Sequence, residues 1–207
     1  KAALYANTTA SNNTAVGYAS LGANTTGTGN SALGTNSLPA CTTGDHNVAI
    51  GYQSQRLTTT ADNNTGLGAY TLYDNTTGAS NTAVGFSALA NNTTASNNVA
   101  VGQNALLANT TGTNNTACGM QSLKANTTAS NNTAVGLNAL VTNTTGANNT
   151  ALGSSALTDS TTGADNTAVG YQALQQNTTG HSNTAVGKVS LVANTQGLRN
   201  TALGFNS

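Results

Sequence analysis

The stretch Asn183-Thr184-Ala185-Val186-Gly187 recurs, with small changes, twelve times along the chain. Its glycine returns every 17 residues, from Gly17 to Gly204, without an insertion or a deletion. A short fixed period is typical of architectures in which each repeat stacks on the next. Seventeen residues suit one coil of a β-solenoid and are too few for a helical pair or a propeller blade. The sequence therefore predicts an all-β fold, a parallel β-solenoid (β-roll) of about twelve 17-residue coils, each with two or three short strands.

The whole chain, residues 1–207, is predicted to be one repeat domain that begins and ends inside a repeat, as a piece of a longer protein would. Charged residues make up 5% of it, against about 25% in an ordinary globular domain. The net charge is zero, so the basic surface of a nucleic-acid-binding protein is missing. No apolar run approaches the ~18 residues of a membrane helix, so we expect no membrane insertion in this segment.

Three columns of the repeat are predicted to build the interior. The residue before each glycine (the pre-glycine column) is always apolar or cysteine, and a leucine column follows four residues after the glycine. We expect both to be core columns, represented by Val16, Ile50, Val84, Val135, Val186, Leu21, Leu89, Leu140 and Leu191. The asparagine that opens the repeat never changes, which predicts an amide ladder from coil to coil. Its representatives are Asn13, Asn47, Asn98, Asn149 and Asn200.

The residue between the opening Asn-Thr and the pre-glycine column (the alanine column) is Ala in eleven copies and Gly66 in the twelfth. Strand side chains alternate between faces, so an inward Val186 would turn Ala185 outward. An outward position that never exceeds a methyl group predicts close lateral packing of a parallel homo-oligomer through this column. The predicted interface consists of Ala15, Ala83, Ala134, Ala185 and their equivalents. The alternative is a tight bend inside the coil that forbids a larger side chain.

The residue after the glycine (the post-glycine column) collects five of the eight aromatic residues, namely Tyr18, Tyr52, Phe86, Tyr171 and Phe205. Because Lys188 lies in the same column, we expect the column to be at least partly exposed. Two interpretations stay open. The rings either pack over a neighbouring coil or chain, or they form an apolar stripe for a ligand or a host surface.

Two stretches, Asn47-Val48-Ala49-Ile50-Gly51 and Asn98-Val99-Ala100-Val101-Gly102, resemble the N-x-V-A-I-G head repeat of trimeric autotransporter adhesins. The longer pattern N-T-A-V-G-x-x-A-L-x-x-N-T-T-G is also similar to repeats of phage tail fibres and of bacterial surface fibres with an endosialidase-type chaperone domain. The resemblance implies a left-handed β-roll, packing as a homotrimer, and an extracellular place on a bacterial surface or a virion fibre. The 17-residue period differs from the shorter head repeat.

These observations favour a non-enzymatic structural or adhesive fibre segment whose partners are copies of itself and a host-surface protein or glycan. No catalytic residues, cofactor or metal site are expected, because His46 and His181 stand in variable turns with no constellation around them. Cys41 and Cys118 lie four and a half coils apart, too far for a disulfide. The alternative function is ice binding, because a turn threonine recurs on every coil from Thr8 to Thr195. Its neighbour in sequence is also threonine, however, and two adjacent residues would point to opposite faces.

Overall fold

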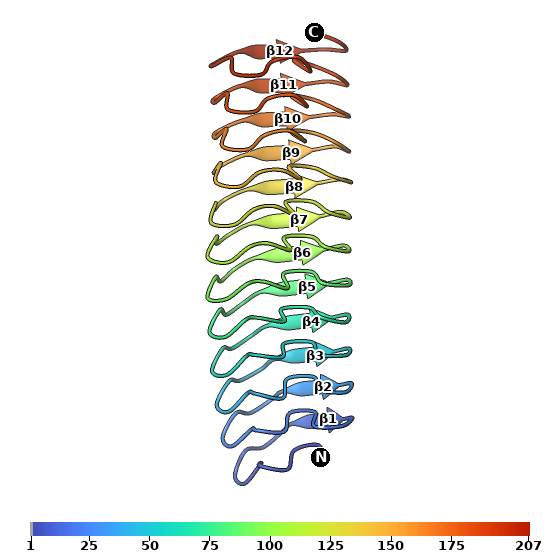
Figure 1. The fold of residues 1–207 in the computed structure, drawn as a ribbon, viewed down its shortest axis with the longest axis vertical. Helices are drawn as coiled ribbons and strands as arrows, with labels where there is room; N and C mark the ends of the chain where they lie inside the picture. The colour runs from blue at the N-terminus through green and yellow to red at the C-terminus, as the bar shows by residue number, and fades with distance from the viewer. Residues whose placement is uncertain (1) are drawn as a thin grey trace.

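The computed structural model describes residues 2–207 as a straight stack of similar coils, with the two termini at opposite ends (Figure 1). Each coil contributes one three-residue strand to a single 12-stranded parallel sheet whose strand order follows the sequence. The strands are β1 Thr14–Val16, β2 Ser31–Leu33, β3 Val48–Ile50, β4 Thr65–Leu67, β5 Thr82–Val84, β6 Val99–Val101, β7 Thr116–Cys118, β8 Thr133–Val135, β9 Thr150–Leu152, β10 Thr167–Val169, β11 Thr184–Val186 and β12 Thr201–Leu203.

The register confirms the solenoid. Every strand residue pairs with the residue 17 positions later, as Ala134 pairs with Ala151, and from β1 to β12 the chain makes eleven complete turns. The prediction of two or three strands per coil was wrong, because the described residues hold one strand per coil. Backbone hydrogen bonds still join the remaining segments of adjacent coils, for example from Leu140 N–H to Ala156 O at 3.0 Å. These segments are turns, in which residues with positive φ recur two positions apart, such as Asn138 and Leu140.

The two faces of each strand are the reverse of those predicted. Ala83, Ala134 and Ala185 are fully buried inside the solenoid, and Ala15 at the N-terminal end is partly buried against the same interior. The pre-glycine column points outward. Val16 and Val135 are exposed, at 57% and 39%, and Ile50, Val84 and Val186 are only half-buried. The core assignment of these five pre-glycine residues and the lateral interface through the alanine column are therefore both wrong.

The alanine column points inward because the space between the sheet and the opposite wall of the coil is too small for a larger side chain. The alanine column faces a column of buried Ser, Thr and Ala residues three positions after the glycine, such as Ser54 and Thr71. A Cβ atom built on Gly66 would lie 2.5 Å from Ser54 Oγ and 2.8 Å from Thr71 Oγ1, closer than side chains approach one another. Only a methyl group or a hydrogen atom fits there. The alternative interpretation was right that the cause lies inside the coil, but the cause is the facing Ser/Thr/Ala column and not a tight bend.

The leucine column is buried as predicted. Leu21, Leu89 and Leu140 are fully buried, and Leu191 near the C-terminal end packs against the same core cluster while partly buried. The leucines adopt left-handed backbone conformations, such as φ 52° at Leu140, which cost a non-glycine residue of the order of 1 kcal/mol. Burying the leucine side chain stabilises the fold by about 1.5–3 kcal/mol, which exceeds the cost of the left-handed backbone conformation.

The predicted asparagine ladder is present, although its links use the backbone. Asn149 donates its backbone N–H to Oδ1 of Asn132 at 2.9 Å, and its Nδ2 to the turn carbonyl of Gly163 at 2.8 Å. The same two bonds recur along the solenoid, with Asn13, Asn47 and Asn98 as donors to the turn and Asn200, at the exposed end, as a backbone donor. Each amide therefore ties a strand to the next coil and to its own turn, which satisfies polar groups in a thin interior.

The core is interrupted once. One cluster of buried side chains runs from Leu21 to Ala49, a second begins at Leu72, and Gln55 stands between them in the leucine column. Gln55 is fully buried and donates Nε2 to the Val48 carbonyl at 2.8 Å, while its Oε1 has no hydrogen-bond partner. The interior of this coil is thus polar where the coils on either side are apolar.

Candidate functional site

The outer face of the sheet is the longest uniform surface of the molecule. It consists of two columns, the first strand residue (Thr133 in β8) and the pre-glycine residue (Val135), because the alanine between them points inward. The pre-glycine column reads Val16, Leu33, Ile50, Leu67, Val84, Val101, Cys118, Val135, Leu152, Val169, Val186 and Leu203. No charged residue lies in either column. The strands stack from β1 to β12 (Figure 1), and their outer face is an uncharged strip made of one apolar column and one column rich in threonine.

The dimensions of this strip can be estimated from strand geometry. Twelve strands at ~4.8 Å spacing give a length of roughly 53 Å, and two outward columns with their side chains give a width of roughly 12 Å. The product, roughly 600 Å², approaches the ~800 Å² that each partner buries in a standard interface.

A second surface is formed by the turn that follows the motif glycine in each coil. We call it the aromatic flank. It consists of the post-glycine column and the columns two and five residues after the glycine, which add Tyr5, Tyr70 and Tyr73 to the five predicted rings. All five predicted rings are exposed, from 46% for Tyr52 to 73% for Phe205. Sequence reasoning missed the other three because they fall in different columns. Reading all three columns as one surface would have found them.

The rings of the flank make contacts along the stack. Tyr70 lies edge-on to Tyr52 and to Phe86, with ring centroids 5.5 and 5.7 Å apart, and also 5.7 Å from Tyr73. The Arg56 guanidinium lies 5.1 Å from the centre of the Tyr73 ring and donates Nη1 to the Tyr73 hydroxyl at 2.9 Å. These four rings and the arginine form one continuous cluster over three coils. Farther along, the Lys188 ammonium lies 5.9 Å from the Tyr171 ring and 5.8 Å from the Phe205 ring.

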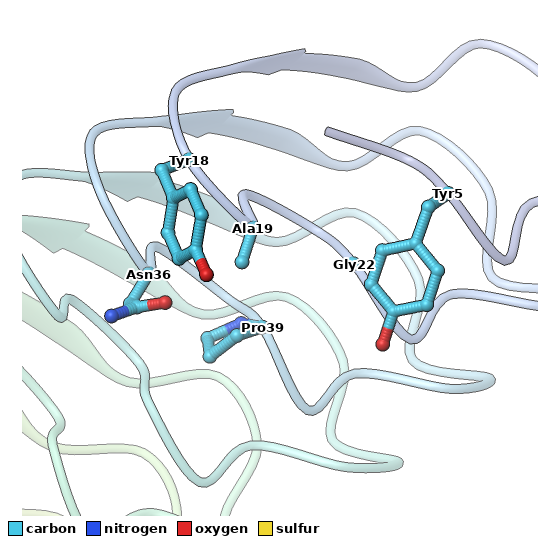
Figure 2. A pocket seen from close by; sticks show the side chains of 6 residues that line it. All are labelled: Tyr5, Tyr18, Ala19, Gly22, Asn36 and Pro39. Carbon is cyan, nitrogen blue, oxygen red and sulfur yellow. The ribbon is translucent and has the colours of Figure 1, made fainter. Parts of the chain in front are cut away.

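The flank is hollowed near its N-terminal end. A depression of about 250 Å³ lies between the rings of Tyr5 and Tyr18, with Ala19 between them and Gly22, Pro39 and Asn36 completing its lining (Figure 2). A Cβ atom at Gly22 would lie 2.6 Å from Cε1 of Tyr5, so the Tyr5 ring rests directly on that glycine. Among the residues that the structure describes, no charged side chain lines the depression. Its lining consists of two aromatic walls, a small apolar floor and one amide.

The titratable groups do not assemble a catalytic or metal-binding site. Within residues 2–207 no group of three or more His, Cys, Asp or Glu side chains is close enough to hold a metal ion. His46 and His181 lie on exposed turns. Cys41 is buried, and this burial raises the pKa of its thiol to about 11, so the thiol stays protonated and unreactive. Cys118 is exposed in the pre-glycine column, and both cysteines are free thiols.

Over the same residues there is no helix with the length and apolar character needed to cross a membrane. No family model, no curated protein and no solved structure matches the chain.

Proposed function

We propose that the protein is a non-enzymatic fibre segment, in which copies of the solenoid pack side by side and present a repeated adhesive surface. The observation that carries the proposal is the outward apolar strip of the sheet, unbroken over twelve strands and free of charge. A solvent-facing strand normally carries polar or charged residues at such positions. Twelve successive apolar or cysteine side chains instead favour a permanent neighbour.

The neighbour that fits this strip is a second copy of the chain in parallel orientation. A partner must repeat with the same spacing to stay in register over the full length, and another copy does so by construction. Contact through the pre-glycine column would bury one apolar side chain per coil and chain, so a modest gain per coil is multiplied along the rod. The interface therefore belongs to the pre-glycine column and not to the buried alanine column.

A trimer is the assembly that we favour. The resemblance to trimeric adhesin heads and tail-fibre repeats supports three chains, a left-handed roll and an extracellular place on a bacterial surface or a virion fibre. The low charge and the uniform repeat suit a passive rod that supplies length, and repetition along the rod supports adhesion to a host-surface protein or glycan by avidity.

The test is the mass of the particle in solution by sedimentation equilibrium. The parent chain should sediment as a trimer, and Val135→Lys combined with Val169→Lys should dissociate it, because like charges would meet along the strip. Asp45→Lys is the matched control, since Asp45 lies in a turn, where its Oδ1 accepts the Thr28 backbone N–H at 2.6 Å. A monomeric parent chain, or dissociation by the control alone, would refute lateral assembly.

Ice binding stays a second candidate because of one observation. The turn threonines are unsuited, since their hydroxyls are used between coils, as when Thr110 Oγ1 donates to the Thr127 carbonyl at 3.1 Å. The first strand residue is Thr in nine of twelve strands, however, and it lies on the flat outer face. Hydroxyls such as that of Thr133 make no hydrogen bond within the described residues. The test is to measure thermal hysteresis, the gap between the melting and freezing temperatures, for the parent chain and for the Val135→Lys, Val169→Lys variant. Hysteresis in either protein would support ice binding, and its absence in both would eliminate this function.

A further inference from the structure

The depression on the aromatic flank occupies the place of a missing ring. Tyr18, Tyr52 and Phe86 stand in the post-glycine column on every second coil. Between Tyr52 and Phe86 the intervening coil inserts Tyr70, which touches both rings. Between Tyr18 and Tyr52 the equivalent residue is Asn36. The same shift of 34 residues relates Pro39 to Tyr73. The coil after Tyr52 therefore fills this position on the flank with the rings of Tyr70 and Tyr73. The coil after Tyr18 carries Asn36 and Pro39 there and leaves a space, which we call the open slot.

We propose that the open slot is a binding site for one pyranose ring of a neutral saccharide chain. This inference deepens the adhesive part of the proposed function and rests on it, but it does not depend on lateral assembly. The C–H face of a pyranose ring would stack on the Tyr18 ring, in the space that Tyr70 occupies two coils later. A depression of about 250 Å³ is smaller than the ~300–1,000 Å³ pockets that enclose whole drug-sized ligands, so it suits one ring of a longer chain.

Polar groups at the slot agree with a saccharide more than with a purely apolar partner. The side-chain amide of Asn36 lines the depression and makes no hydrogen bond within the described residues, so both its donor and acceptor atoms can meet sugar hydroxyls. The Tyr18 hydroxyl points toward the region between Ala19 and Pro39, two other residues that line the depression (Figure 2). Tyrosine combines an apolar face with a polar end, which is the combination that an amphipathic sugar ring requires.

The charge distribution selects a neutral saccharide. Among the described residues 2–207 no charged side chain lines the slot, and the nearest arginine along the flank, Arg56, is already engaged by the Tyr73 ring and hydroxyl. An anionic sugar would meet no cation among these lining residues. The exposed rings of Tyr52 and Phe86 continue the flank toward the C-terminus, so further sugar units would lie along the solenoid axis.

The experiment is titration with three neutral tetrasaccharides, maltotetraose, cellotetraose and mannotetraose, followed by NMR of the tyrosine ring protons. At least one should bind with a dissociation constant in the millimolar range or below and shift the Tyr18 signals. Tyr18→Ala should weaken this binding by roughly tenfold, the size of one lost stacking contact. Asn36→Tyr with Pro39→Tyr should abolish it, because these are the side chains that the chain itself uses to fill the equivalent slot.

The matched control is Tyr171→Ala, which removes a ring of the same column that does not line the depression, and it should leave the affinity unchanged. Far-UV circular dichroism should be the same for all variants. The proposal is overturned if no tetrasaccharide shifts the Tyr18 ring, if the slot-filling variant still binds, or if a sialylated tetrasaccharide or a tyrosine-containing peptide binds more tightly. Saccharide binding by a monomeric chain would refute lateral assembly alone, and a trimer without binding would refute this inference alone.

Discussion

The same substitution at two neighbouring positions, Ala134→Asp and Val135→Asp, tests which face of strand β8 is inside. Ala134 is fully buried and pairs with Ala117 and Ala151 on the adjacent coils. An aspartate there would be an unpaired charge in the core and would also exceed the space available for a methyl group. A buried charge without a partner costs about 3–5 kcal/mol, and overpacking adds about 1–3 kcal/mol.

Val135→Asp should cost much less. Within one solenoid the Val135 side chain is 39% exposed, so its carboxylate replacement places no charge in the core of the coil. The loss consists of part of the ~1.5–3 kcal/mol of valine burial and up to ~1 kcal/mol of strand propensity, about 1–2 kcal/mol together. The two variants should therefore differ by about 3 kcal/mol or more, although their substitutions are chemically identical and adjacent.

The assay is urea denaturation followed by far-UV circular dichroism, with midpoints compared because repeat arrays need not unfold in two states. Ala134→Asp should be unfolded or have a strongly lowered midpoint, whereas Val135→Asp should stay close to the parent. One aspartate leaves eleven of the twelve residues of the pre-glycine column intact, so assembly should not dominate the result. A larger loss of stability in Val135→Asp than in Ala134→Asp would refute the inward placement of the alanine column.

Three further outcomes are expected. Gly136→Ala should lower stability by at least ~3 kcal/mol, measured by denaturation, because its φ is 134° and a Cβ atom would lie 2.6 Å from the Gly153 carbonyl group. A fully tolerated alanine would contradict this spacing of the coils. Gln55→Leu should raise the unfolding midpoint and stabilise the protein by about 1–3 kcal/mol, because it removes a buried acceptor without a partner and joins the two core clusters. A lower midpoint would show that the polar coil is required. The folded-state pKa of Cys41 is raised above its unfolded value, so folding stability should fall as the pH rises from about 9 to about 11. Thermal unfolding of Cys41→Ala should lack that part of the decline, and equal slopes for both proteins would contradict the assignment.

The period and the identity of the columns were available from the sequence alone. Seventeen residues between glycines fix the length of a coil, and stacking identical coils leaves a parallel in-register sheet as the consistent arrangement. The leucine column and the opening asparagine were assigned to the interior correctly, because a leucine that recurs on all coils but that of Gln55, and an asparagine that never changes, have few other places to go. These features depend on composition and spacing, which are local to the sequence.

The direction in which each strand faces was decided only by the tertiary structure. Alternation says that Ala134 and Val135 lie on opposite faces, but it is equally satisfied by either assignment. Hydrophobicity favoured Val inside. The close approach of the Ser/Thr/Ala column behind the sheet admits only a methyl group and reverses the choice. The same is true of the aromatic flank, where Tyr70 and Asn36 become equivalent only once the coils are stacked. The 17-residue period of the sequence specifies which residues stack above one another. The space between the sheet and the opposite wall of the coil depends on the path of the whole coil, so it is seen only in the tertiary structure.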